Sequence, residues 1–407
     1  MSFSKFGLSD AVLQGVKASG YHTPTKIQSE TIPLVMSGRD IIGCAPTGTG
    51  KTAAFVLPIL HQLADVHPAS QHHRAPRVLV LSPTRELTNQ IKEAVATYGS
   101  FTKISSVAVF GGVSINNQVA AIQKGTDIVV ATPGRLLDLV NRRSINLSHI
   151  QVLVLDEADR MYDMGFIKDV RKIIALIPRK RQTLLFSATM PDEIRKIVAE
   201  IQHDPAYVEI GRHSTPTVTV VQEFYKIARQ AKPDLLVSVL KHESVNIALV
   251  FSRTKHGADR IARKLAQSGL SACVLHSNRT QAQRQQALDG FKQGRFKILV
   301  ATDIAARGID VDGISHVVNY DTPVFAEDYV HRIGRTGRAE STGTAMTFVS
   351  SEEITYLRRI EKLTGAKAEL KSYPGYESSI EVEKPVAPVT QAASRYTRKY
   401  FRTPRFA

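Results

Sequence analysis

The sequence has few cysteines, no tryptophan and no long apolar run. Its two cysteines, Cys44 and Cys273, stand far apart inside apolar stretches. This pattern favours buried free thiols over a disulfide or a metal pair, and it fits a reducing cytosol. No apolar segment approaches the roughly 20 residues that a membrane-spanning helix needs. The N-terminus also lacks the basic-then-apolar order of a secretory signal. We therefore expect a cytoplasmic protein without a membrane anchor.

Positive charge is in clear excess. The 407 residues include 53 Lys and Arg against 37 Asp and Glu, which gives a formal net charge of +16. Such an excess favours a polyanionic partner, although a basic surface that maintains solubility would explain it equally well. The composition, 43% hydrophobic and 22% charged, is typical of a globular protein, and the length predicts two or three folding units.

Short β-branched runs alternate with amphipathic helical stretches, which predicts an α/β protein with parallel sheets covered by helices. The predicted strands are 41–45, 78–82, 107–110, 127–131, 152–155 and 183–187 in the first half, and 248–251, 272–275, 297–301, 316–319 and 345–348 in the second. Between the two sets, the Thr-, Gly- and Pro-rich stretch 209–220 lacks helical periodicity. We interpret it as a linker that enters an edge strand.

The two halves resemble each other. LVLSPTR in the first half is similar to LVFSRTK in the second, and the interval from Ser82 to Thr132 equals that from Ser252 to Thr302. Short strand sequences also match by chance, so a duplication is favoured rather than established. If it holds, two similar lobes present Ser and Thr side chains at the carboxyl ends of their strands, where open α/β sheets bind ligands.

Toward the C-terminus the signs of ordered structure weaken. After Glu383 the chain has no acidic residue but carries interleaved basic and aromatic side chains, namely Lys384, Arg395, Tyr396, Arg398, Lys399, Tyr400, Phe401, Arg402, Arg405 and Phe406. This terminus is either a solvated, disordered segment or, as we favour, a flexible arm that holds phosphates and stacks on bases. The expected division is 1–211 and 212–371 for two lobes and 372–407 for a flexible basic tail.

A phosphate-binding loop follows the first predicted strand. It comprises Ala45, Pro46, Thr47, Gly48, Thr49, Gly50, Lys51 and Thr52, and a helical run follows it. The glycines let backbone N–H groups form a nest around phosphates. Lys51 supplies a positive charge, and the Thr52 hydroxyl can ligate Mg²⁺. The alternative that this segment is only a Gly-rich turn is weak, because GTGKT after a strand is a specific string. The segment therefore predicts a nucleotide-binding site.

A group of carboxylates follows the predicted strand 152–155, in the order Asp156-Glu157-Ala158-Asp159. Asp156 is placed to provide the second Mg²⁺ contact, and Glu157 is the candidate that orients and deprotonates the attacking water. Asp is also favoured as a helix cap, so these residues have a purely structural interpretation. Together with the phosphate loop, they predict nucleotide hydrolysis.

The combination of APTGTGKT with Asp-Glu-Ala-Asp resembles the DEAD-box ATP-dependent RNA helicases, most closely the bacterial RhlE type. The family's motifs follow in order from Phe3 to about residue 370. The resemblance implies two tandem RecA-like domains and an RNA-stimulated ATPase that uses ATP and Mg²⁺. Such an enzyme closes on single-stranded RNA or a short duplex, with little sequence preference, and unwinds it locally. We expect a monomer, with ribosomal or mRNA-processing assemblies as its partners.

The resemblance also assigns roles on the first lobe. Gln28 would hydrogen-bond the adenine edge, Tyr21 would stack on the base, and Phe3 would support the pocket from upstream. Ser187 and Thr189 would couple the phosphate site to the RNA site, a role that rests on analogy.

On the second lobe, the resemblance concerns two neighbouring motifs. Arg335 and Arg338 would reach the γ-phosphate as arginine fingers, and His331 would tie their loop to the carboxylates of the first lobe. Asp310 would hold the ribose, and Arg307 would help to position water and the finger arginines. In isolation, the HRIGRTGR string could be a basic surface turn.

By resemblance, RNA contacts come from strand ends and helix starts. They would be Pro83, Thr84, Arg85, Gly112, Thr132 and Arg135 in the first half and Arg253, Arg284, Thr302 and Gly308 in the second. Hydroxyls, arginines and backbone N–H groups suit phosphates and 2′-hydroxyls rather than base edges.

The sequence departs from the family pattern at two positions, and it leaves two rival functions. Pro46 stands where the family more often has glutamine, and Ser277 replaces a usual glycine, which leaves rate and nucleotide affinity open. The first rival function is an ATP-gated RNA clamp or annealing factor. The second is a DNA-dependent motor on the same two lobes.

Overall fold

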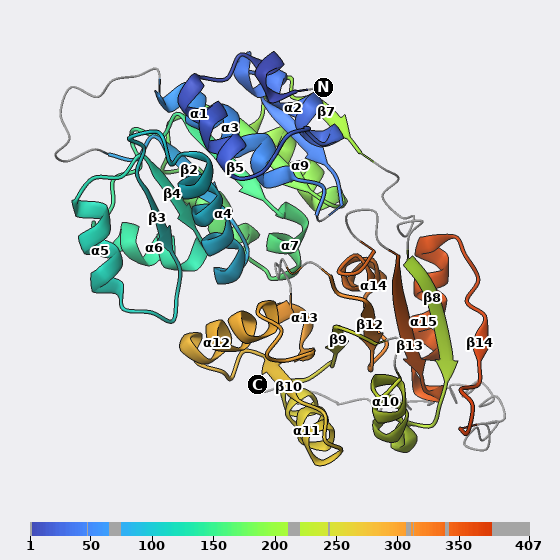
Figure 1. Cartoon of the computed structure of the whole chain (residues 1–407). Coiled ribbons are helices and arrows are strands. Elements are labelled where there is room, and N and C mark those ends of the chain that lie inside the picture. Colours follow the sequence, from blue (N-terminus) through green and yellow to red (C-terminus); the bar gives the residue numbers. More distant parts are fainter. Residues whose placement is uncertain are drawn as a thin grey trace, which may run out of the picture.

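The computed structural model describes residues 2–46, 48–64, 75–210, 220–242, 245–306, 311, 313–337 and 342–376, which form two α/β lobes. In Figure 1 the first lobe, blue to green, lies above the second, yellow to red. Residues 211–219 of the predicted linker 209–220, and the basic segment 384–407, lie outside the described residues. Within the described part of the chain, no helix combines the length and apolar character needed to cross a bilayer.

The first lobe is built on a parallel seven-stranded sheet with the order β3-β4-β2-β5-β6-β1-β7. Its strands are β1 (Ile41–Cys44), β2 (Val78–Leu81), β3 (Ser106–Val109), β4 (Ile128–Ala131), β5 (Val152–Asp156), β6 (Gln182–Ser187) and β7 (Ala206–Glu209). Its helices are η1 (Phe3–Phe6), α1 (Asp10–Ala18), α2 (Lys26–Met36), α3 (Lys51–Ala64), α4 (Arg85–Tyr98), α5 (Ile115–Gln123), α6 (Pro133–Asn141), α7 (Ala158–Asp163), α8 (Ile167–Ile174) and α9 (Asp192–Ile201).

Helices cover both faces of this sheet, which explains why its strands are continuous hydrophobic runs. Along β2, Val78 and Val80 pack on the side of α1, α2, α3 and α4. Leu79 and Leu81 point to the opposite layer, which contains α6, α8 and α9. The alternation follows from the two-residue period of a strand and produces two separate cores.

The second lobe repeats this architecture with the sheet order β10-β11-β9-β12-β13-β8-β14, again parallel. Its strands are β8 (Val220–Lys226), β9 (Ala248–Phe251), β10 (Ala272–Leu275), β11 (Ile298–Ala301), β12 (His316–Asn319), β13 (Gly343–Val349) and β14 (Leu370–Lys371). Its helices are η2 (Arg229–Ala231), α10 (Lys232–Leu240), α11 (Lys255–Gln267), α12 (Gln281–Lys292), α13 (Asp303–Ala306), α14 (Ala326–Ile333), η3 (Ser351–Glu353) and α15 (Ile354–Thr364). Helices α10 and α11 cover one face, and α12, α14 and α15 cover the other.

The two sheets correspond strand by strand, with β2 matching β9 and β1 matching β8. Local details agree as well. Thr84 and Thr254 cap the equivalent helices α4 and α11, each accepting a hydrogen bond from the backbone N–H three residues on. Ser82 and Ser252 donate their backbone N–H groups to the equivalent carbonyls of β4 and β11. This correspondence supports the duplication that the sequence suggested.

The structure confirms the predicted α/β class and corrects some details. All the predicted strands are present, and both cysteines are buried and free. The linker does not lead into an edge strand, because β14 pairs with β8 on its outer side. The second lobe also continues past residue 371. Tyr373 and Tyr376 pack on its core, and the Tyr376 hydroxyl lies 2.9 Å from that of Ser238.

Candidate active site

The phosphate-binding loop joins β1 to α3. The backbone N–H of Ala45 donates to the Ser187 carbonyl at 3.1 Å, which fixes the start of the loop against β6. Gly48 and Gly50 have φ of 84° and 90°, the left-handed region that favours glycine. The Thr49 hydroxyl closes the turn by donating to the Pro46 carbonyl at 2.8 Å. Thr47 lies outside the described residues.

Lys51 is the first residue of α3, and only 7% of it is exposed. Its ammonium donates to the carbonyls of Ala45, at 2.5 Å, and Pro46, at 3.4 Å. Burial lowers the pKa of Lys51, while the neighbouring carboxylates of Asp156 and Asp159 oppose that shift. The ammonium group is thus held at the centre of the loop, where the negatively charged phosphates of a nucleotide could pair with it.

The carboxylates stand at the tip of β5. Burial raises the pKa of Asp156 to about 6, against the opposing effect of Lys51. Glu157 is buried beside it and has a left-handed backbone, with φ of 52° and ψ of 54°. That conformation is unfavourable for a residue with a side chain and is typical of functional sites. The Glu157 carboxylate forms a buried ion pair with Arg160.

The same residues fit a magnesium ion. Asp156 is a buried carboxylate whose pKa is raised by burial, and Thr52 follows Lys51 in the first turn of α3. The described part of the chain contains no cluster of three or more acidic, histidine or cysteine side chains that could hold a metal. This donor set suits Mg²⁺, which one or two protein oxygens and the phosphates of its nucleotide commonly bind.

Asp159 connects the carboxylates to the end of β6. Its side chain accepts hydrogen bonds from the backbone N–H of Thr189 at 2.9 Å, from the Thr189 hydroxyl at 3.0 Å and from the backbone N–H of Ala188 at 3.2 Å. The Ser187 hydroxyl in turn accepts from the Asp159 backbone N–H at 3.1 Å. The predicted coupling residues therefore contact the carboxylate segment directly.

The predicted adenine-contacting residues lie beside the loop. Gln28 is buried in α2, where its amide nitrogen donates to the Gly50 carbonyl at 3.1 Å and its amide oxygen accepts from the Thr25 backbone N–H at 2.9 Å. Tyr21 is 48% exposed and packs edge-on against Tyr98. Phe3 is buried in the first core. Gln28 thus touches the phosphate loop, and Tyr21 leaves a ring available.

The second-lobe motif surrounds the end of α14. Arg332 is buried and forms a bidentate ion pair with Asp303, at 2.6 and 2.8 Å, and its guanidinium lies over the Phe251 ring. Arg335 is buried next to it and, with His331, lines a small cavity. Arg307, Gly308, Asp310 and Arg338 lie outside the described residues.

The predicted RNA contacts of the first lobe gather at the carboxyl ends of β2, β3 and β4. Arg85 lies over Gly111 and Gly112, and a side chain on Gly112 would collide with its guanidinium. Thr132 precedes α6, and Arg135 donates to the Val113 carbonyl at 3.2 Å. Pro83 and Thr84 are buried at the turn that leads into α4.

The predicted RNA contacts of the two lobes meet each other. Arg284 on α12 forms an ion pair of 2.7 Å with Glu86 on α4, and the Arg85 guanidinium donates to the Gln281 side chain at 3.5 Å. Figure 1 shows α12 on the side of the second lobe that faces the first. Arg253 lies at the end of β9, bonded to Glu353 and Asp321. Thr302 follows β11, and its backbone N–H donates to the Leu275 carbonyl.

Sequence reasoning missed four residues of this arrangement. Glu86 and Arg160 look like ordinary charged residues of a first helical turn, and no pattern in the sequence indicates that they form ion pairs. For Arg332 and the connecting role of Asp159, the only signal was their position inside strings already assigned to the site.

Comparisons with known proteins place the chain in a family. Residues 25–197 match the model "DEAD/DEAH box helicase", and residues 231–340 match "Helicase conserved C-terminal domain". The chain is 43% identical to the ATP-dependent RNA helicase CshA of Listeria monocytogenes over 95% of its own length and 73% of that protein. It is 41% identical to the DEAD-box ATP-dependent RNA helicase CshA of Geobacillus kaustophilus, over 95% and 81%.

A solved structure of S. cerevisiae Dbp5 bound to RNA and ADP BeF3 matches with a TM-score of 0.81 and 32% identity, over 91% of this chain and 95% of that one. This match confirms the two tandem RecA-like domains. The narrower RhlE resemblance is not supported, because these bacterial relatives are named CshA. The chain belongs to the DEAD-box ATP-dependent RNA helicases.

Proposed function

We propose that this RNA-stimulated ATPase works as a two-lobe clamp that separates short RNA duplexes. The observation that carries the proposal is the contact between Arg284 and Glu86, which joins the predicted RNA-binding elements of both lobes. A strand held by these elements would rest on both lobes at once. ATP would then fix the lobes in the arrangement that bends the strand, and a bent strand cannot keep its partner paired.

The chemistry falls to residues of the first lobe. Lys51 would leave the carbonyls of Ala45 and Pro46 and bind the β- and γ-phosphates. The phosphates would stabilise its charged form, which burial disfavours. Asp156 and Thr52 would hold Mg²⁺, which neutralises the charge that develops on the phosphates. Glu157 would leave Arg160, then orient the attacking water and accept its proton.

Arginines of the second lobe would complete the site. Arg335 is buried beside Arg332 within its own lobe, so closure would have to present its guanidinium to the γ-phosphate. The planar donors of arginine suit that charge. Asp310, Arg307, Arg338 and His331 retain the roles that the resemblance assigns. Hydrolysis would require closure because the two halves of the site stand on different lobes.

Coupling between nucleotide and RNA would pass through Asp159. Its carboxylate holds the end of β6 through Thr189, and its own backbone N–H is held by Ser187. A change of the Asp156–Glu157 segment on phosphate release would therefore move these bonds. Gln28 would add a second route, since its amide contacts Gly50 of the loop and would also recognise adenine.

We further propose a monomer that acts in the bacterial cytoplasm, alone or in ribosomal or mRNA-processing assemblies. The proposed lobes are 1–211 and 212–371, the second extended to Tyr376 by the packing of Tyr373 and Tyr376 on its core. The basic tail would tether RNA loosely and raise its local concentration. Binding would be largely independent of sequence, because the donors suit phosphates and 2′-hydroxyls.

The test compares ATP turnover with single-stranded RNA and with DNA of the same sequence, and measures strand displacement with ATP and with a non-hydrolysable analogue. The clamp predicts stimulation by RNA well above that by DNA, and repeated displacement only with ATP. Equal stimulation by DNA would favour the DNA motor. Tight RNA binding without displacement would favour a static clamp or an annealing factor.

A further inference from the structure

The second lobe contains a cavity of about 690 Å³ between α10 and α11, at the carboxyl ends of β9 and β12. Its size is within the range of sites that bind small molecules or nucleotides. Ser252, Arg253 and Thr254 line it on the side of β9, and Tyr320 and Asp321 line it on the side of β12. The cavity is separate from the phosphate loop and from the contact between the two lobes.

The matching groove of the first lobe is covered. There α1 packs across α3 and α4, with the Ser9 backbone N–H donating to the His61 ring at 3.1 Å. Gly15 lies so close to the Tyr98 backbone that a side chain at that position would collide with it. Among the described residues of the second lobe, no helix precedes β8, so nothing equivalent to α1 covers the groove between α10 and α11.

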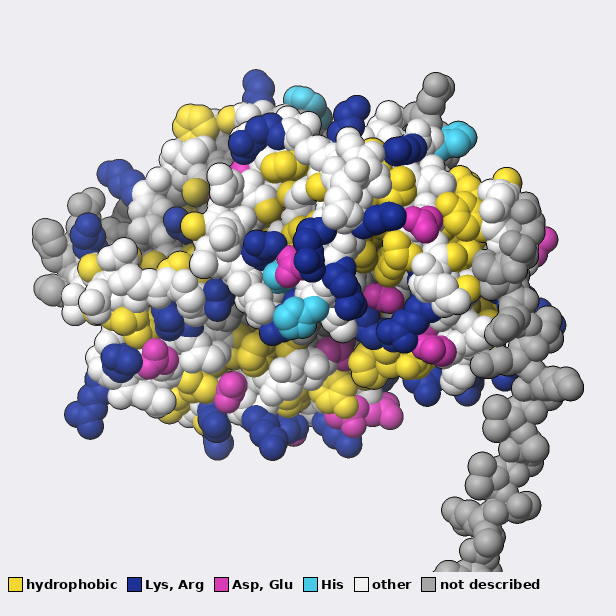
Figure 2. All heavy atoms as spheres, turned by 90° about the horizontal axis from the view of Figure 1, so that it is seen from below, with side chains coloured by type: hydrophobic (Ala, Val, Ile, Leu, Met, Phe, Trp, Pro, Cys, Tyr) yellow, Lys and Arg dark blue, Asp and Glu magenta, His cyan; other side chains and the backbone are white. Residues whose placement is uncertain are grey.

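The lining of the cavity carries more cationic than acidic side chains. Five cationic side chains line it, namely Arg229, Lys232, Arg253, Arg260 and Lys264. The acidic side chains in its lining are Asp234 and Asp321. Figure 2, which views the molecule from the side where α10 and α11 lie in Figure 1, shows Lys and Arg side chains gathered in the middle of this face. Such a lining favours an anionic ligand.

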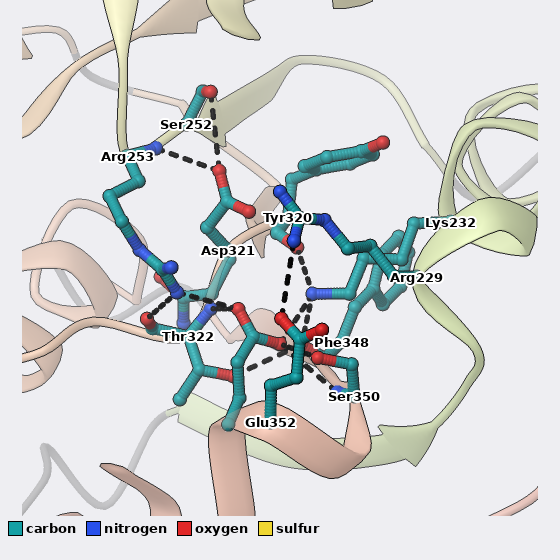
Figure 3. A network of polar contacts seen from close by, with 12 residues as sticks. Arg229, Lys232, Ser252, Arg253, Tyr320, Asp321, Thr322, Phe348, Ser350 and Glu352 are labelled. Atoms are coloured by element: carbon teal, nitrogen blue, oxygen red, sulfur yellow. Dashed lines mark hydrogen bonds and ion pairs between the residues drawn. The ribbon is translucent and has the colours of Figure 1, made fainter.

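Lys232 belongs to the floor of the cavity and not to its binding groups. Its ammonium donates to Glu353 at 2.5 Å and to the carbonyls of Tyr320 and Phe348 at 2.9 and 3.1 Å. Figure 3 shows Lys232 reaching toward the backbone of Tyr320 and Phe348, with Arg229 beside it directed at Glu352. Arg253 is likewise bonded to Glu353, at 2.8 Å. This buried network keeps the floor rigid.

The outer cations are available to a ligand. Arg260 is exposed, and in the described part of the chain no acidic side chain lies within ion-pair distance of it. Lys264 pairs with Asp234 at 2.8 Å and Arg229 with Glu352 at 3.2 Å, both partly or largely exposed. Exposed pairs of this kind contribute little and can open for a phosphate. Tyr320 adds an aromatic ring on which a base can stack.

We propose that this cavity receives a nucleotide of the RNA strand that flanks the segment held between the lobes. Arg260 and Lys264 bind its phosphate, and Tyr320 contacts its base. The inference rests on the proposed RNA clamp, since Arg253 is both a predicted RNA contact and part of the rim. Two other occupants fit less well. The chain's own basic tail would be repelled by the cations of this surface, and an apolar helix would have to bury those cations without a charged partner.

The test uses the full-length protein and single-stranded RNAs of increasing length, with a saturating non-hydrolysable ATP analogue. The variants are Arg260→Ala, Arg260→Glu and the double change Arg260→Ala with Lys264→Ala. Arg358→Glu, an exposed charge reversal on α15 at the opposite face of the sheet, is the matched control. The measured quantity is the ratio of affinities for long and for short strands.

The proposal predicts that this ratio falls about tenfold in the double variant, the worth of one charged hydrogen bond. The salt slope for long strands should also fall by about 0.7 for each lost phosphate contact. An unchanged ratio, an equal loss at every length, or the same loss in Arg358→Glu would overturn it. In the first case, an acidic protein segment becomes the candidate occupant. Absence of RNA-stimulated turnover in the unmodified protein would instead contradict the proposed function.

Discussion

Arg284 on α12 forms an ion pair with Glu86 on α4, and 2.7 Å separates the guanidinium nitrogen from the carboxylate oxygen. Only 11% of the arginine side chain and 5% of the glutamate side chain are exposed. The pair crosses from one lobe to the other at the point where Arg85 also contacts Gln281. Because it is screened from water, this contact makes the relative position of the lobes depend on two specific charges.

The first prediction concerns this pair. Glu86→Gln and Arg284→Gln should each lower the affinity for RNA in the presence of an ATP analogue, because each leaves a buried charge without its partner. The binding free energy for RNA that the double variant loses should be smaller than the sum of the two single losses, with a coupling of about 0.5–3 kcal/mol in a double-mutant cycle. Arg171→Gln, which breaks an exposed pair with Glu200 inside the first lobe, is the control and should have no effect. Strictly additive losses would show that the pair does not couple the lobes.

The second prediction concerns the proposed base. Glu157→Gln should bind ATP and RNA but lower turnover by about 10²–10⁴, because an amide cannot accept the proton of the attacking water. The measurement is RNA-stimulated phosphate release, with thermal unfolding as a check because Arg160 loses its buried partner. Turnover close to that of the unmodified protein would remove Glu157 from the mechanism.

A third prediction compares two neighbouring glycines. Gly112→Ala should displace Arg85, since the new methyl group would collide with the guanidinium, and φ there is 81°. RNA affinity should fall about tenfold with the loss of one charged contact. Gly111→Ala is the matched control, because its methyl group would lie 3.5 Å from the same guanidinium, an ordinary contact. If both variants bind RNA equally well, the position of Arg85 does not matter for binding.

The fourth prediction is a pH dependence of stability. Burial alone would raise the pKa of Asp127, but hydrogen bonds from Ser105 and the ion pair with Arg77 outweigh it, so the pKa is lowered. A lowered pKa means that the carboxylate stabilises the fold at pH values above its unfolded-state pKa. Asp127→Asn should therefore lower the free energy of unfolding by about 1.5–3 kcal/mol at pH 7.

The difference between Asp127→Asn and the unmodified protein should shrink as the pH falls below about 4, where the unfolded-state carboxylate takes up its proton, and should vanish below the lowered pKa of the native carboxylate. Denaturant unfolding at several pH values measures it. A difference that stays constant down to pH 2 would mean that the ion pair does not contribute.

Much of the fold could be predicted from the sequence, because buried parallel strands are apolar throughout and leave a clear local pattern. The strands β7 and β14 were not predicted, for two different reasons. Along β7, Tyr207 and Glu209 are exposed and alternate with buried residues. The β14 strand is two residues long and exposed. Neither strand has the continuous apolar run that marks the others.

The candidate site divides in a similar way. Lys51, Asp156 and Glu157 were predictable because their chemistry requires particular residue types at fixed positions after a strand. The interaction partners of Arg160, Arg284 and Asp159 were not predictable, because these contacts depend on how the elements pack in three dimensions. The cavity beside Arg260 depends on how α10 and α11 pack and on the finding that no helix in the described part of the chain covers them, which no local pattern records.

The central claim is that ATP and RNA stabilise the same closed arrangement of the two lobes. The most direct test measures the affinity for a non-hydrolysable ATP analogue with and without saturating single-stranded RNA, and the affinity for RNA with and without the analogue. Linkage requires the two ratios to be equal, and a shared closed state predicts that each exceeds about fivefold. If both ratios equal one, the ligands bind independently, and the two-lobe clamp is contradicted.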